Sequence, residues 1–510
     1  MEKRIIALKS TFVFLFVFSF LYTWNAQAAE LPAATKAKLH QIIGKLENAG
    51  AQVGLEIDDL GTVKNPQQFP AKSTFPSKVL FSYRATQSYM SASNWKLFTA
   101  FYALKGDAFD DVRDSGLFTK ERFEGGSVID GDLYFLGMGD PSLNIEQIRH
   151  AALELKQKGV QEIKGDIIGE TNYFAETLGE RYPFGWTLDD SLWYYAPPIT
   201  LLSINRNQVD VDITGGDKPG DPATVTYSPP LPGVEIKSHV ITGTKFLLSK
   251  PVDELLHWDR FAENGGGVTV TGYISPNQRI TQGIALVHPT LIATKVLFQE
   301  LQKAGIKIDG TVTTKDQNSI LSQPGDGIYG IVNIPAPPLK VLLTRMLKRS
   351  DNFYAEIILR TSLNEFGTVD VMRKYFFTVL RENGISTSGL RMEDGSGLSR
   401  YTLITPNATT QLLDSAQKLP KDRAGIFWNA LPIAGVDGTL GERMDSTFAQ
   451  NNVRAKTGTF STACNLSGYV TTRDGHRLAI SFLMNFGPDT DICRAAQDQA
   501  FELLAAGKLQ

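Results

Sequence analysis

The chain has 510 residues and a formal charge of −3 at pH 7, with 42% hydrophobic and 21% charged residues. This composition is that of a globular protein, and the charge is not basic enough to indicate nucleic-acid binding. A chain of this length exceeds a single ordinary core, so we expect two or more domains.

The N-terminus has the three parts of a secretory signal. Lys3 and Arg4 make a basic start, an apolar stretch runs from Thr11 to Trp24, and Ala26-Gln27-Ala28 is a small-residue cleavage site. The alternative is an uncleaved membrane anchor, but the stretch is short for a span, and no later run of about 18 apolar residues follows it. We therefore expect residues 1–28 to be removed, leaving a periplasmic protein without a transmembrane anchor.

The secondary structure that the sequence predicts after residue 28 changes near residue 109. Residues 31–47 have helical spacing, residues 53–57 alternate like a strand, and residues 58–61 (Asp-Asp-Leu-Gly) read as a turn. From about Phe109, short strands broken by glycines begin, and one helix at residues 144–158 interrupts them.

The pattern of short predicted strands continues to Ala285. Helical periodicity returns at residues 289–304 and dominates to about Lys418.

The end of the chain reads as a small antiparallel unit followed by a helix. Strands are predicted at residues 454–459, 465–472 and 477–486, with a turn at Asp474-Gly475 and a helix at residues 490–506.

Three short motifs occur in a fixed order along the chain. They are S-x-x-K at Ser93–Lys96, S-x-N at Ser350–Asn352 and K-T-G at Lys456–Gly458. Each motif alone is weak evidence for an active site, since such short patterns also arise by chance. A second S-x-x-K, for example, occurs at Ser415–Lys418. Ser93 has the better setting because the apolar run at residues 97–104 predicts a buried helix with the motif at its first turn. In this order the set indicates an enzyme that acylates a serine with a penicillin or a D-alanyl peptide.

The spacing of the motifs predicts an inserted region. Ser350 follows Ser93 by 257 residues, whereas Lys456 follows Ser350 by only 106. Since the three motifs must meet in one cleft, we expect a catalytic domain made of residues 29–106 and 286–510. Residues 107–285 would then form one or two inserted β-rich domains.

The sequence resembles the serine-type D-alanyl-D-alanine carboxypeptidase/endopeptidase family, the low-molecular-weight class C penicillin-binding proteins (peptidase S13-like). Besides the large insert, the resemblance rests on four stretches: Ala196-Pro197-Pro198, Ser350-Asp351-Asn352, the loop Asp394–Arg400, and Ala455–Thr459. It implies an α/β fold, with a penicillin-recognising, β-lactamase-like catalytic domain whose antiparallel sheet has flanking helices. It also implies peptidoglycan peptides and β-lactams as partners, with no cofactor or metal.

The resemblance and the chemistry of the residues together suggest roles for the motifs. Lys96 would deprotonate Ser93, which requires a lysine pKa depressed by burial and by the nearby cation Lys456. Ser350 would relay a proton to the departing D-alanine, and Asn352 would orient Lys96 or hold the substrate amide.

The K-T-G strand would bind the substrate. Lys456, with the hydroxyls of Thr457 and Thr459 on either side of Gly458, would hold the terminal carboxylate of the peptide. The oxyanion would lie between the backbone N–H groups of Ser93 and Thr459.

A more peripheral resemblance concerns the insert. Asp189 and Asp190 stand at a position that resembles the family's pocket for the amino end of a diaminopimelate side chain, and Arg400 could face its carboxylate. The alternative is a turn with solvated acids, and the sequence leaves both open.

The chain has only two cysteines, Cys464 and Cys493, which are too few for a scaffold held together by disulfides. The predicted hairpin brings Cys464 near the helix that carries Cys493, so a single disulfide is geometrically plausible. Two buried thiols are the alternative.

Two other functions fit the same motifs. One is a β-lactamase of the same superfamily, and the other is a penicillin-binding sensor or scaffold with slow turnover. The sequence leaves homo-oligomer formation open.

Overall fold

The computed structural model describes residues 29–65, 67, 77–106, 114–170, 181–244, 252–261, 267–315, 327–362 and 369–510. The predicted signal segment, residues 1–28, lies outside the described residues. Within these ranges, none of the helices is both long enough and apolar enough to cross a membrane.

Two distant stretches of the chain form one sheet. Its five described strands are antiparallel, in the order β19 (Arg454–Phe460), β20 (Ala463–Thr471), β21 (His476–Asn485), β1 (Gln52–Thr62) and β2 (Lys78–Tyr83). The N-terminal strand β1 pairs along β21, so the closing hairpin of the chain completes a sheet that begins near the N-terminus. The predicted hairpin strands are confirmed, and β19, which carries K-T-G, is the edge strand.

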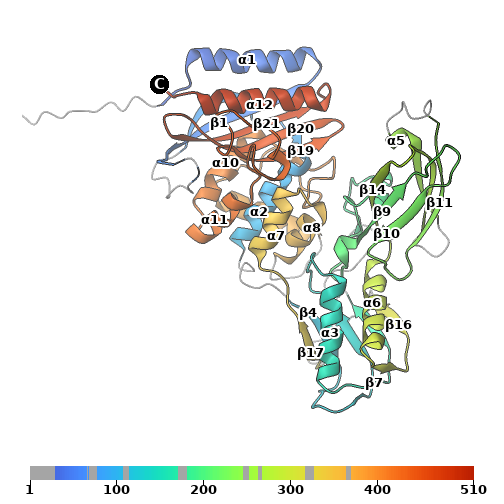
Figure 1. Ribbon diagram of the computed structural model, residues 1–510. Helices are drawn as coiled ribbons and strands as arrows, with labels where there is room; N and C mark the ends of the chain where they lie inside the picture. Colours follow the sequence, from blue (N-terminus) through green and yellow to red (C-terminus); the bar gives the residue numbers. More distant parts are fainter. Residues whose placement is uncertain are drawn as a thin grey trace, which may run out of the picture.

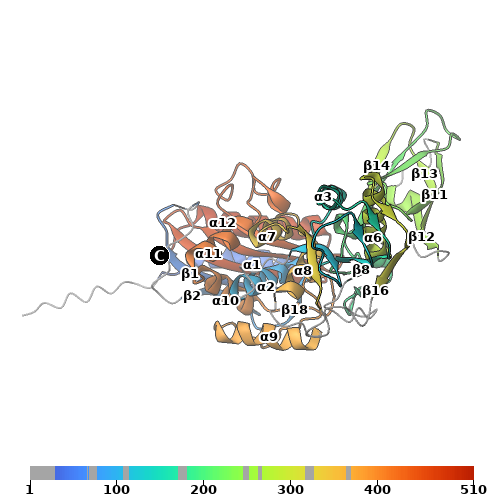
Figure 2. The same cartoon turned by 90° about the horizontal axis from the view of Figure 1, so that it is seen from below.

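Helices cover both faces of this sheet (Figure 1). On one face lie α1 (Ala33–Asn48) and α12 (Thr490–Ala506), which pack against each other and against the sheet. The other face is covered by helices that include α2 (Trp95–Lys105), α7 (Leu339–Lys348), α8 (Asn352–Thr361), α10 (Pro406–Gln417) and α11 (Lys421–Ala430). Figure 2 shows α9 (Val369–Glu382) on the outside of this second layer. The expected antiparallel sheet with flanking helices is confirmed.

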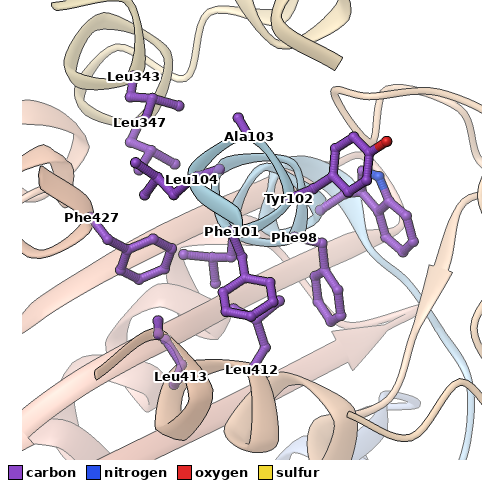
Figure 3. Packing of buried hydrophobic residues seen from close by; sticks show 14 of the residues in the cluster. Phe98, Phe101, Tyr102, Ala103, Leu104, Leu343, Leu347, Leu412, Leu413 and Phe427 are labelled. Carbon is purple, nitrogen blue, oxygen red and sulfur yellow. The ribbon is translucent and has the colours of Figure 1, made fainter. Parts of the chain in front are cut away.

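Helix α2 lies within the hydrophobic cluster between the sheet and these helices. Every residue from Trp95 to Leu104 is buried, as expected for a helix that is apolar on all sides. Figure 3 shows its side chains packed against leucines of α7 and α10 and against Phe427 of α11. Burying one such phenylalanine contributes about 1.5–3 kcal/mol. This packing fixes the position of the S-x-x-K motif at the start of the helix.

The turn predicted at residues 58–61 is wrong. Strand β1 continues to Thr62, and Asp58 and Asp59 pair with Ala479 and Leu478 of β21. Neighbouring strands on both sides supply hydrogen-bond partners, and this pairing overrides the local turn preference of Asp and Gly.

The inserted region contains two parts, one of mixed α/β structure and one of strands (Figures 1 and 2). The mixed part has a sheet in the order β16 (Val312–Lys315), β8 (Ile167–Glu170), β6 (Leu133–Leu136), β4 (Ser115–Thr119) and β17 (Tyr329–Ile334). Helices α3 (Ile145–Gln157) and α6 (Pro289–Lys303) pack together beside it, with a smaller sheet of β15 (Lys307–Ile308), β7 (Glu162–Ile163) and β5 (Val128–Ile129).

The other part consists mainly of two further sheets, with the short helix α5 (Val252–Leu255) directly before β12. Their orders are β10 (Thr224–Ser228), β9 (Gln208–Thr214), β14 (Arg279–Ala285) and β11 (Glu235–Thr242), β13 (Gly267–Ile274), β12 (Leu256–Phe261).

The structure differs from the expected end of the insert at residue 285. Helix α6 shares a hydrophobic cluster with α3, β16 pairs with β8, and β17 pairs with β4, so the strand pairing extends the insert to about residue 334. Helical periodicity predicted α6 correctly, but periodicity carries no information about which sheet a helix packs on.

Cys464 and Cys493 are buried free thiols. Burial raises the pKa of Cys464 to about 12 and also raises that of Cys493, so both groups stay protonated. Of the two alternatives that the sequence left open, the structure has the thiols.

Candidate active site

The three motifs meet in one place. Ser93 lies in a short 3₁₀ turn, η1 (Ala92–Asn94), directly before α2, and is partly exposed, whereas Lys96 in the first turn of α2 is fully buried. Lys96 Nζ lies 3.0 Å from Ser93 Oγ. The serine is thus open to a substrate while its lysine neighbour is shielded from water.

Two further acceptors hold the Lys96 amine. Nζ donates to Asn352 Oδ1 at 2.6 Å and to the backbone carbonyl of Ser396 at 2.8 Å. The amide of Asn352 is itself fixed, because its Nδ2 donates to the carbonyl of Tyr195 in the inserted region at 2.8 Å. The S-x-N motif therefore reaches the S-x-x-K motif directly.

Ser350 contacts the third motif. It lies between α7 and α8 with a positive φ of 57°, and its Oγ accepts a hydrogen bond from Lys456 Nζ at 2.9 Å. Asp351 caps α8 by accepting from the backbone N–H of Tyr354, which fixes the start of the helix and with it Asn352.

Strand β19 lies against the turn that carries Ser93. The Asn94 side chain donates to the carbonyl of Lys456 at 2.9 Å. A Cβ at Gly458 would lie 2.9 Å from Asn94 Nδ2 and 3.0 Å from the Ser91 carbonyl, so only glycine allows this approach.

The two threonines of this strand differ in their surroundings. Thr457 donates its hydroxyl to Thr439 Oγ1 at 2.8 Å, while Thr459 is exposed on the edge strand.

Burial governs the charge of both lysines. It lowers the pKa of Lys96 to about 8, although the carboxylates of Asp394, Glu356 and Asp351 oppose this effect. Burial also lowers the pKa of Lys456 well below its ordinary value, and repulsion from Lys96 adds to this. The sequence predicted that Lys456 would help to depress the pKa of Lys96, whereas in the structure the repulsion acts on Lys456.

The comparisons with known proteins agree with this geometry. The family model described as D-Ala-D-Ala carboxypeptidase 3 (S13) matches residues 57–506. The chain belongs to this S13 family. A D-alanyl-D-alanine carboxypeptidase of Actinomadura sp. (strain R39) is 28% identical over 435 residues, which is 81% of this chain and 76% of that protein. The D-alanyl-D-alanine carboxypeptidase DacB of Haemophilus influenzae is 25% identical over 431 residues, covering 82% of this chain and 85% of that protein.

Solved structures show the same fold. The crystal structure of penicillin binding protein 4 (dacB) from H. influenzae matches with a TM-score of 0.75 at 22% identity, covering 91% of this chain and 97% of that one. The structure of that protein complexed with a β-lactam matches with a TM-score of 0.70. The family resemblance and the fold class expected from the sequence are confirmed.

Asp189, Asp190 and Arg400, which the sequence analysis assigned to a peripheral pocket, have different surroundings in the structure. Asp189 is exposed at the start of the short turn η3 (Asp189–Leu192). Asp190 is buried and accepts from Thr187 Oγ1 at 2.6 Å and from Tyr195 at 3.1 Å. Arg400 lies 3.5 Å from the same Asp190 carboxylate. The sequence treated the acid and the arginine as facing a ligand separately, but they form an ion pair with each other.

Sequence reasoning missed several contacts of this S13 site. Tyr195 and Ser396 contribute backbone carbonyls, which every residue has, so no side-chain pattern could have identified them. Trp186 donates its indole N–H to Asp394 Oδ2 at 3.0 Å and so ties the insert to the Asp394–Arg400 loop. The Asp394–Arg400 loop was singled out in the sequence, but its contact with Trp186 is a tertiary property.

Proposed function

We propose that this protein is a periplasmic serine peptidase that cleaves D-Ala-D-Ala and D-alanyl-diaminopimelyl bonds of peptidoglycan peptides through an acyl-enzyme on Ser93. It would act both as a carboxypeptidase and as a D,D-endopeptidase, and penicillins would acylate the same serine. The observation that carries the proposal is the position of Lys96 Nζ, 3.0 Å from Ser93 Oγ.

The geometry suits a neutral lysine acting as the base. A neutral amine has two N–H groups and one lone pair, and the carbonyl oxygens of Asn352 and Ser396 can only accept. If they take both N–H groups, the lone pair is left for Ser93 Oγ. A pKa of about 8 makes a substantial fraction of this amine neutral near physiological pH.

Substrate binding would move a proton between the two lysines. The terminal carboxylate of the peptide, bound by Lys456, Thr457 and Thr459, would stabilise the ammonium form of Lys456. Because like charges repel, this ammonium would favour the neutral form of Lys96. The site would thus become active when the carboxylate arrives.

The chemistry then follows in two steps. Ser93 Oγ attacks the D-alanyl carbonyl as Lys96 takes its proton, and the oxyanion lies between the N–H groups of Ser93 and Thr459. Ser350 passes its proton to the departing amine and takes one from the Lys456 ammonium, to which it is hydrogen-bonded, while Lys96 keeps the proton of Ser93. Water then attacks the ester and gives a proton to Lys456 through Ser350, and Lys96 returns its proton to Ser93 Oγ as the acid leaves.

The Asp190–Arg400 pair is the proposed site for the end of the diaminopimelate side chain. That end carries both an ammonium and a carboxylate, so it can exchange partners with an existing ion pair, and the exposed Asp189 lies beside it. Asp189→Asn and Asp190→Asn are expected to alter the relative rates on free and amidated diaminopimelyl substrates. Unchanged relative rates would remove this part of the proposal.

Labelling with fluorescent penicillin followed by peptide mapping tests the main proposal. The label is expected on Ser93 and is expected to be lost in Ser93→Ala without a change in melting temperature. Label on another residue refutes the assignment.

Assays of D-alanine release and of cross-linked muropeptide cleavage identify the reaction. Turnover of both substrates supports the proposed peptidase. Rapid hydrolysis of penicillin without either peptidase activity indicates a β-lactamase, and labelling without any turnover indicates a sensor.

A further inference from the structure

We propose that Glu356 is a positioning residue for this reaction: it fixes the backbone N–H groups of Gly395 and Ser396, next to the Ser396 carbonyl that holds Lys96, and places a buried negative charge behind that amine. The inference rests on the proposed function, since it concerns how the base at Ser93 is prepared.

The contacts form a short chain from the carboxylate to the amine. Glu356 Oε1 accepts the backbone N–H groups of Gly395 at 3.0 Å and Ser396 at 2.8 Å. The carbonyl of the same Ser396 accepts from Lys96 Nζ at 2.8 Å. Through one peptide segment, the position of Glu356 therefore determines where one of the acceptors of Lys96 lies.

Helix α8 carries both side chains that hold Lys96 from this direction, Asn352 and Glu356. Asn352 and Glu356 are four residues apart, so they lie on the same face of the helix. Asn352 contacts Lys96 directly, and Glu356 contacts it through Ser396. The loop is pressed against the helix, because a Cβ at Gly395 would lie 2.8 Å from the Ala355 carbonyl and 2.9 Å from Leu359 Cβ.

The contacts of Glu356 require an ionised carboxylate. Its Oε2 accepts from Arg360 at 2.7 Å, and both partners are buried, with exposures of 0% and 6%. All three groups that contact the carboxylate oxygens across these bonds are donors, which leaves no acceptor for a protonated carboxyl among the contacts that the structure describes. Burial raises the pKa of Glu356, and the ion pair with Arg360 opposes that rise.

A negative charge on Glu356 would raise the pKa of Lys96 and so keep this amine an effective base. Burial alone makes an amine hard to protonate, and a base is most effective when its pKa lies near the working pH. Asp394 and Asp351 add negative charge around Lys96, while Lys456 on β19, whose own pKa burial lowers, is the facing amine. Asp394 also holds this segment, since it accepts from the backbone N–H of Gly397 at 3.1 Å, whereas Glu356 accepts the two N–H groups on the other side of the Ser396 carbonyl.

Two variants separate the charge from the geometry. Glu356→Gln removes the charge and keeps an acceptor, whereas Glu356→Asp keeps the charge and shortens the side chain. The matched control is Glu300→Gln in α6, since Glu300 is also buried and paired, with Arg149 and Lys303, but lies in the insert.

The measurement is the second-order rate constant for acylation by fluorescent penicillin between pH 5.5 and 10. Glu356→Gln is expected to move the midpoint of the acid limb down by about one pH unit and to lower the plateau about tenfold. Glu356→Asp is expected to lower the plateau while leaving the midpoint unchanged, and Glu300→Gln to change neither.

An unchanged midpoint and plateau in Glu356→Gln, with normal labelling of the wild-type protein, overturns this inference and leaves the proposed function intact. Failure of the wild-type protein to label at Ser93 refutes the proposed function instead. If Glu356→Gln does not fold because its amide faces Arg360, the neutral pair E356Q/R360Q replaces it. A smaller downward shift is expected in this variant, because the positive charge of Arg360 is removed as well; such a shift supports the inference, and an unchanged profile overturns it.

Discussion

Replacing Asn352 by aspartate puts a carboxylate where the structure has an amide oxygen 2.6 Å from Lys96 Nζ. The two side chains have nearly the same shape, so Asn352→Asp keeps the packing, but it adds a charge and replaces the N–H donor to the Tyr195 carbonyl by an oxygen. The new charge stabilises the ammonium form of Lys96 and so withdraws the base that Ser93 needs.

The size of the effect follows from the distance and the pKa. Two unit charges at this separation attract by about 6 kcal/mol at an effective dielectric constant of 20, which is an upper limit because the aspartate must also be desolvated. Allowing for that cost, the acid limb of acylation is expected to move up by about two pH units. Since the pKa of Lys96 is about 8, the neutral fraction at pH 8 falls from about one half to about one in a hundred, and acylation falls about fifty-fold.

The assay is acylation by fluorescent penicillin between pH 6 and 11, with recovery of the rate expected at high pH. Asn452→Asp is the control, because Asn452 also donates its amide to a backbone carbonyl, that of Thr471 at 2.7 Å, but lies away from the three motifs. An acid limb in Asn352→Asp that stays in place or moves to lower pH refutes Lys96 as the base.

Three other substitutions test the surrounding structure. Gly458→Ala is expected to push β19 away from Asn94, to cost about 1–3 kcal/mol and to slow labelling at least tenfold, so labelling at the wild-type rate contradicts the close approach. Burial raises the pKa of Asp58 to about 7 from 3.8. The folded state therefore loses stability as pH rises between these two values. Asp58→Asn should thus stabilise the protein against thermal unfolding by about 2 kcal/mol at pH 8 but not at pH 4. Trp186→Phe removes the donor to Asp394 and should slow labelling about tenfold, whereas a change confined to the melting temperature refutes a link between the insert and the site.

Local patterns predicted the elements that carry the motifs. The apolar run after Lys96 predicted α2, since a helix buried on all sides is made mostly of apolar residues. The closing hairpin and α12 were also predicted from alternation and turn chemistry, and the structure confirms them. These are elements whose form depends mainly on their own residues.

The misses concern contacts between distant segments. The strand through Asp58 and Asp59 exists because β21 and β2 lie on either side of it. The pairing of Asp190 with Arg400 joins a short turn in the insert to a loop that follows α9. Periodicity and turn preference report only on neighbouring residues, so neither could predict these contacts.

By itself, the sequence predicted the candidate reactive groups of this protein: a serine with a lysine one turn later, and two further motifs in the order typical of enzymes that acylate a serine. Only the tertiary structure decided how the Lys96 amine is held, because two of its acceptors, Asn352 Oδ1 and the Ser396 carbonyl, come from segments far away in the chain. The physical reason is that the pKa of a lysine depends on burial and on nearby charges, and both are set by how distant segments pack.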